Sequence, residues 1–98
     1  MLDTFTIETF QPRLGELFHV VAEGHRLPVK LTQIHPWGPE AAKGRPRVPF
    51  SLVFHAVPQL VLPQAIYRVE NDQMEPFELF LVPLGPDERG MQYEAVFT

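Results

Sequence analysis

The chain has 98 residues, of which 45% are hydrophobic and 20% charged, a balance typical of one folded domain. Its formal net charge of −4 excludes a strongly basic surface that would attract nucleic acid or an anionic membrane. The absence of cysteine excludes disulfides, thiolate nucleophiles and thiolate metal sites. The first ten residues lack the pattern of a signal peptide, and no apolar run is long enough to span a bilayer. We therefore expect a single domain over residues 1–98 of a cytoplasmic protein without membrane contact.

The start of the chain carries the only convincing helical signal. Thr6 is a suitable N-cap residue, and Ile7 and Phe10 then lie three residues apart on one face of a helix. Pro12 cannot donate a backbone hydrogen bond and so limits the helix to about two turns. We expect an N-terminal helical segment within residues 1–14.

Beyond this segment the apolar residues recur at every second position, which is the period of a strand. Two extended runs within residues 16–36 surround a turn at residues 23–26 and predict a hairpin. Turns are also expected near residues 71–76 and 83–90. The pattern predicts a mainly β fold, a small antiparallel six-stranded barrel or sandwich with one short N-terminal helix. The other four strands are expected at residues 49–56, 65–71, 77–83 and 91–97.

Residues 36–48 are rich in proline and glycine and predict a long exposed loop. Trp37 in this loop is either a lid over a barrel end or a contact residue for a partner. A basic cluster beside an aromatic residue can bind single-stranded nucleic acid or an acidic partner. The acidic balance of the chain favours the simpler alternative, a solvated loop. The basic cluster comprises Lys43, Arg45 and Arg47.

The four histidines do not predict a metal site. In the expected hairpin, His19 lies opposite residue 31 or so, and His35 is roughly 13 Å further along the strand. His25 falls in the turn, and the position of His55 relative to the others is undetermined. Because metal ions need two or three converging ligands, we expect no metal or cofactor and place the histidines on the surface.

The sequence also predicts no catalytic site. Most carboxylates fall in turns or on outward positions, and Glu78 and Glu94, which could be neighbours on the last hairpin, would both face solvent. The only serine, Ser51, lies on an expected strand without a glycine-rich elbow. No glycine-rich phosphate-binding loop is present. We therefore expect a protein that is not an enzyme.

The run from Phe77 to Val82 is apolar on both faces, with Glu78 as its only polar residue. Strand alternation assigns one face to the core. The expected core residues are Phe77, Leu79 and Leu81 with Phe50, Leu52, Tyr93 and Phe97.

The opposite face of this run needs a cover of its own. It holds Phe80 and Val82, with Val53 and Val96 of neighbouring strands. We expect the N-terminal helix to cover it through Phe5, Ile7 and Phe10, and a partner or a second copy of the chain is the alternative. The candidate interface residues are Phe80, Val82, Val96 and Trp37.

Four stretches, MLDTFTIETFQPRLGELFHV, RVPFSLVFHA, LPQAIYRVEN and FELFLVPLGPDERGMQYEAVF, resemble a small bacterial family described as domain of unknown function 6916. The resemblance covers nearly the whole chain and is densest after residue 49. Family members are stand-alone proteins of about this size that usually carry glycine in place of Ala65 and asparagine in place of Thr98. The resemblance assigns no catalytic residue. Through gene neighbourhoods that encode phage-tail-collar-like proteins, it implies an accessory role beside a tail-fibre-like or surface-displayed protein.

These observations predict a non-catalytic accessory or assembly module that self-associates or docks on a protein partner. A small-molecule-binding β-barrel is the first alternative, and Tyr93 and Tyr67 are the polar groups available inside it. Weak binding of nucleic acid or an acidic partner through residues 37–47 is the second alternative. Nucleic acid is the less expected ligand because the chain is acidic overall.

Overall fold

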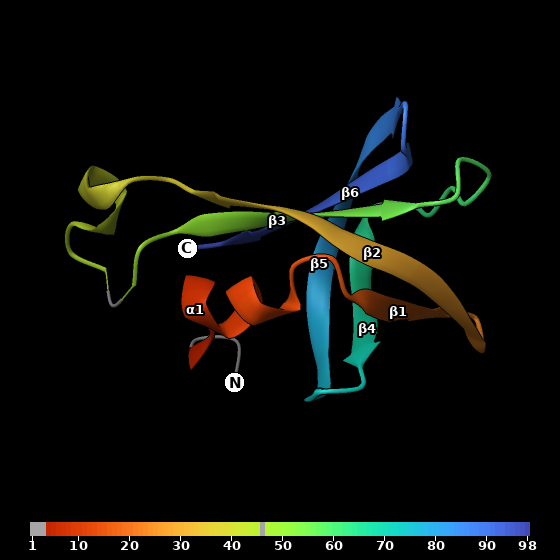
Figure 1. Ribbon diagram of the computed structural model, residues 1–98, viewed down its shortest axis with the longest axis horizontal. Coiled ribbons are helices and arrows are strands. Elements are labelled where there is room, and N and C mark those ends of the chain that lie inside the picture. Colours follow the sequence, from red (N-terminus) through yellow and green to blue (C-terminus); the bar gives the residue numbers. More distant parts are fainter. Residues whose placement is uncertain (1–3, 46) are drawn as a thin grey trace.

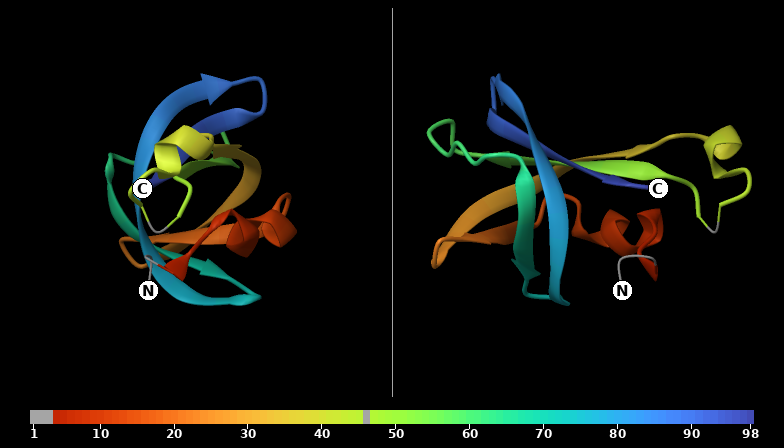
Figure 2. Two further views of the ribbon diagram at one scale, coloured as in Figure 1. Left: turned by 90° about the vertical axis from the view of Figure 1, so that its left-hand side faces the viewer. Right: turned by 180° about the vertical axis from the view of Figure 1, so that it is seen from behind.

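The structure is a computed structural model that describes residues 4–45 and 47–98. Six antiparallel strands form a closed barrel in the order β1-β2-β3-β6-β5-β4 (Figures 1 and 2). The predicted fold class is confirmed, and the barrel is the correct one of the two architectures left open. The strands are β1 Leu17–Ala22, β2 His25–Pro36, β3 Phe50–Ala56, β4 Ala65–Asn71, β5 Met74–Asp87 and β6 Gly90–Phe97.

The turn between β1 and β2 consists of Glu23 and Gly24, which have φ angles of 51° and 80°. Positive φ at both positions gives a turn whose twist matches that of the flanking strands. The register pairs His19 with Pro28. The expectation that His19 lies opposite residue 31 was wrong, because the turn is centred one position earlier than assumed.

β5 is longer than predicted and continues to Asp87, so most of the expected turn over residues 83–90 is strand. Its register with β6 shifts between Pro83 and Gly85. Such an irregularity accommodates proline, which has no N–H to donate, and Gly85 supplies a φ angle of 98°. As a result, the end of β5 and the start of β6 project from the barrel as a two-stranded arm (Figure 1).

The interior of the barrel is filled by one apolar cluster to which all six strands contribute. Along β5, the buried side chains of Phe77, Leu79 and Leu81 alternate with the exposed ones of Glu78 and Phe80. This alternation follows the pleat of the strand and confirms the predicted core face. The other predicted core residues, Phe50, Leu52, Tyr93 and Phe97, are buried as well.

The N-terminal segment forms α1 Ile7–Phe10 followed by the 3-10 turn η2 Gln11–Arg13. Thr6 precedes the helix as predicted, and its backbone N–H donates to Oγ1 of Thr9 at 3.0 Å. The expected length of about two turns is confirmed for the part of the segment within the described residues; residues 1–3 lie outside them. No helix in the described part of the chain is long and apolar enough to cross a membrane.

This segment closes one end of the barrel (Figure 2). The Phe10 ring has no exposed surface and lies 5.4–6.1 Å, centroid to centroid, from four other phenylalanine rings. The expectation that the segment covers the Phe80 face was wrong, because the core at the barrel end offers its aromatic rings deeper burial than the convex outer surface. The four surrounding rings are those of Phe5, Phe50, Phe77 and Phe97.

The loop between β2 and β3 contains a short 3-10 turn, η3 Pro39–Ala42, that the sequence did not predict. Proline at the first position fits the start of a helical turn, because its missing N–H has no partner there. Lys43, Gly44 and Arg45 follow this turn and are exposed. The predicted loop therefore projects from the barrel (Figure 1) with a turn of its own.

The Phe10→Ala substitution is expected to lower the free energy of unfolding by about 3–5 kcal/mol, because it removes a fully buried ring and leaves a cavity. Phe80→Ala is the matched control and should cost less than about 1 kcal/mol, because half of that side chain is already exposed. Urea unfolding followed by circular dichroism measures both. Equal losses would contradict the placement of the helix.

Gly90 starts β6 beside Ala56 at the end of β3. A Cβ atom at this position would lie 2.1 Å from the carbonyl oxygen of Ala56, and the φ angle is 136°. Gly85 also has a positive φ, but a Cβ there would meet open space. Substituting alanine at Gly85 therefore tests backbone strain alone, and substituting it at Gly90 tests strain together with a steric clash.

Gly90→Ala is expected to destabilise the protein by more than about 3 kcal/mol, because strain and a clash with backbone add together. Gly85→Ala should cost about 1–2 kcal/mol from strain alone. Thermal and urea unfolding of both variants provide the comparison. A Gly90→Ala variant as stable as Gly85→Ala would show that β6 does not approach β3 this closely.

Candidate functional site

The outer faces of β4, β5 and β6 carry exposed apolar side chains. Ile66 and Phe80 form a direct cross-strand pair and are 66% and 49% exposed. Val82 lies two residues further along the same face of β5 and is half-buried, and Val96 on β6 is 48% exposed. Val53, which was expected on this face, is buried.

Trp37 lies beside the same surface. Its indole N–H donates to Oγ of Ser51 at 3.4 Å, and Ser51 is the cross-strand partner of Val96. Of the two expected roles, a lid over the barrel end does not match this position, because the ring lies over the outside of β3. We define the outer apolar strip as Trp37, Ile66, Phe80, Val82 and Val96.

The structure thus brings together on the outside of the barrel the interface residues predicted from the sequence. Ile66 was not predicted as an interface residue. The alternation in AIYRVEN nevertheless places its side chain on the outer face of β4, away from the face of the buried Val69. Two carboxylates flank the strip: Glu94 pairs in register with Val82, and Glu78 lies two residues before Phe80. Within the described residues neither carboxylate takes part in an ion pair.

The three residues of the predicted basic cluster have different surroundings. Lys43 and Arg45 are exposed in the loop. The Arg47 guanidinium instead donates to the carbonyl oxygens of Phe5 at 2.7 Å and Thr98 at 3.0 Å, and it lies 5.5 Å from the centre of the Phe97 ring. Arg47 therefore joins the two ends of the domain, and a role in contacting a ligand remains a prediction for Lys43 and Arg45.

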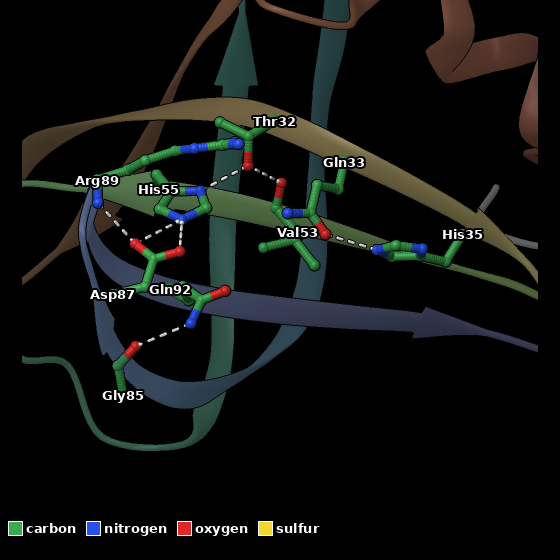
Figure 3. Close-up of polar contacts among 9 residues, drawn as sticks. All are labelled: Thr32, Gln33, His35, Val53, His55, Gly85, Asp87, Arg89 and Gln92. Atoms are coloured by element: carbon green, nitrogen blue, oxygen red, sulfur yellow. Dashed lines mark hydrogen bonds and ion pairs between the residues drawn. The ribbon is translucent and has the colours of Figure 1, made fainter.

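His55 forms the main buried polar cluster (Figure 3). The residue is only 6% exposed, so its expected surface position was wrong. Nε2 donates to the Asp87 carboxylate at 3.0 Å, and Nδ1 lies 2.5 Å from Oγ1 of Thr32. Asp87 reaches the ring because β5 extends into the arm, and Thr32 does so because the β2–β3 register shifts between Leu31 and Gln33. Nothing in the sequence indicated the β2–β3 shift, and Pro83, Gly85 and Pro86 indicated a turn rather than a continued strand.

The Thr32 hydroxyl has a single proton and two candidate acceptors, His55 Nδ1 and the Val53 carbonyl oxygen at 3.2 Å. A neutral ring that donates through Nε2 accepts the hydroxyl proton at Nδ1. A protonated ring donates to the hydroxyl, which then donates to Val53. Hydroxyl, imidazole and carboxylate also occur together in hydrolases, and here the Thr32 hydroxyl lies within reach of both Nδ1 and the Val53 carbonyl oxygen.

The other histidines that were weighed as metal ligands do not converge on His55. His19 Nδ1 lies 3.4 Å from the Arg26 guanidinium, and His35 contacts the Gln33 side chain at 2.6 Å. In the described part of the chain, no three histidine or carboxylate side chains gather into a possible metal site. The Glu70 carboxylate is bonded by Arg26 and Arg68, and the hydrogen bond from Arg26 is the main reason that its pKa is lowered.

The two tyrosines considered for a ligand cavity are bonded to the connection between β3 and β4. The buried Tyr93 hydroxyl accepts from the Leu62 N–H at 2.8 Å and donates to the Leu60 carbonyl at 2.6 Å. The Tyr67 hydroxyl donates to the Pro63 carbonyl at 2.5 Å. Both phenols thus position this connection, which weakens the alternative of a ligand-binding barrel interior.

A family model for a domain of unknown function, DUF6916, matches residues 5–97. The chain belongs to this family. No curated protein and no solved structure matches the chain. The predicted family is thereby confirmed. The family has no described function, so the roles of the outer apolar strip and of the His55 cluster are inferred from their geometry.

In this DUF6916 protein, the hydrogen bond from His55 is the largest of the effects that lower the pKa of Asp87. A carboxyl group with a lowered pKa stabilises the folded state above its ordinary pKa, and this contribution is lost as the pH falls through the folded-state value. The Arg89 N–H, which donates to Oδ1 of Asp87 at 2.8 Å, acts in the same direction.

Asp87→Asn should therefore lower the free energy of unfolding at pH 6, and the difference from the unmodified chain should shrink below about pH 4. Glu88→Gln, in the adjacent turn, is the control and should show a small difference at every pH. Urea unfolding between pH 2.5 and 6 measures both. A constant difference for Asp87→Asn would contradict an ionic role for the carboxylate.

Proposed function

We propose that this DUF6916 protein is a non-catalytic assembly module that docks on a protein partner through the outer apolar strip. The observation that carries the proposal is the exposure of Ile66, Phe80 and Val96 on neighbouring strands of a barrel whose helix is used elsewhere. A group of apolar side chains on an outer sheet face is typical of a binding surface rather than of scattered surface variation. Burying one such side chain fully contributes about 1.5–3 kcal/mol.

The charges around the strip favour a different protein over a second copy. Glu78 and Glu94 both flank it, Arg68 opposite Glu78 is bonded to Glu70, and the chain carries a net charge of −4. Two copies that met face to face through this acidic surface would repel each other at close range. We therefore infer a partner whose apolar contact residues are bordered by lysine or arginine. A tail-collar-like protein is the partner class that the family resemblance suggests.

The first test places a photoreactive phenylalanine analogue at position 80 in the cell that naturally encodes the chain. Mass spectrometry of the cross-linked product is expected to identify one predominant protein partner. Leu14 is the matched control position, because it is 53% exposed but lies outside the strip. Cross-linking to the same protein from both positions, or to none, would overturn the proposal.

The second test measures binding of the purified partner by calorimetry. Phe80→Glu and Val96→Glu should each weaken binding at least tenfold, and Leu14→Glu should leave it unchanged. Light scattering of the chain alone at micromolar concentration should give the mass of a monomer. A dimer that Phe80→Glu dissociates would show that the strip binds a second copy instead.

A further inference from the structure

A second surface, separate from the outer apolar strip, combines apolar walls with positive charge. A pocket of about 620 Å³ lies over the outside of β2 and β3, beside the chain that leaves β3. Leu17, Val57 and Pro58 contribute apolar surface, and Lys30, His55 and Arg89 contribute the charged and polar groups. Neither this pocket nor its basic residues were predicted from the sequence.

The strand register places two of these groups side by side. Lys30 is the direct cross-strand partner of His55 between β2 and β3, and Leu17 is the partner of Lys30 between β1 and β2. Directly paired residues project from the same face of a sheet about 5 Å apart. Lys30 therefore lies between an exposed leucine and the buried imidazole.

The arm supplies the third group. Arg89 occupies the turn between β5 and β6, and Figure 3 shows its side chain extending alongside His55 toward Thr32. Asp87 holds the turn in place by accepting from His55 Nε2 and from the Arg89 backbone N–H. Within residues 4–45 and 47–98, the side chains of Lys30 and Arg89 form no ion pair.

Neither nearby acidic group of the described residues forms an ion pair with these two cations. Asp87 accepts from His55 Nε2 and from the Arg89 backbone N–H, and among the described residues it forms no ion pair with the Lys30 or Arg89 side chain. Glu88, the other carboxylate of the turn, is not among the residues that line the pocket. An acidic protein thus carries, at one apolar pocket, a lysine and an arginine that form no ion pair with any carboxylate of the described residues.

We propose that this pocket binds a small carboxylate with an apolar body. The carboxylate lies between the Lys30 ammonium and the Arg89 guanidinium, whose fork suits two parallel bonds to carboxylate oxygens. The apolar body rests against Leu17, Val57 and Pro58. Both ring nitrogens of His55 are already bonded to the protein, so His55 positions Asp87 and the arm and does not bind the ligand through nitrogen.

The probe is sodium hexanoate, titrated into the full ¹⁵N-labelled chain and followed by the amide resonances of Lys30, Val57 and Arg89. Saturable shifts in the millimolar range are expected. Hexan-1-ol, which has the same apolar body without the charge, should bind at least tenfold more weakly. Inorganic phosphate at the same ionic strength should give no saturable shift, and tighter binding of phosphate than of hexanoate would overturn the choice of ligand.

Variants decide whether the two cations form the site. Lys30→Gln and Arg89→Gln should each weaken hexanoate binding at least fivefold, and Lys43→Gln and Arg45→Gln, at exposed loop cations, should leave it unchanged. The amide spectrum of each variant verifies that it is folded. Hexanoate binding that is insensitive to Lys30→Gln and Arg89→Gln would overturn the proposal. The result is independent of partner docking, because no variant lies in the outer apolar strip.

Discussion

The packing of Phe10 against four other phenylalanine rings at one end of the barrel is the interaction on which the rest of the structure depends. It ties the N-terminal helix to β3, β5 and β6 through Phe50, Phe77 and Phe97. The Arg47 guanidinium lies over two of these rings and joins the backbone at Phe5 and Thr98. A closed barrel has one interior, so a helix that fills its end cannot also cover an outer face.

The outer surface is therefore covered unevenly. All seven residues of β3 are buried. The outward-facing Ser51 is covered by Trp37, and the outward-facing His55 is covered by the arm that carries Asp87. β4, β5 and β6 receive no comparable cover, and Ile66, Phe80 and Val96 remain exposed. The difference between these neighbouring strands leaves an exposed apolar surface on β4, β5 and β6, flanked by Glu78 and Glu94.

The arm formed by β5 and β6 gives the barrel its second chemical surface. The His55–Asp87 contact and the close approach of Gly90 to Ala56 both attach it to the end of β3. This attachment brings Arg89 to the pocket lined by Lys30, although the two residues are far apart in the sequence. The polar cluster that attaches this hairpin thus also brings a second cation to the pocket that Lys30 lines.

The sequence by itself determined the strands and their inward faces, because strand alternation and prolines at strand ends are local properties. It also determined the short N-terminal helix and the family, and it identified the apolar residues at positions 80, 82 and 96. Only the tertiary structure decided which surface the helix covers, that His55 is buried, that Arg47 joins the chain ends and that Lys30 and Arg89 line one pocket. These outcomes depend on register shifts at residues 31–33 and 83–85 and on barrel closure. Barrel closure and the shift at residues 31–33 arise from contacts between distant segments, whereas Pro83 and Gly85 mark the second shift locally.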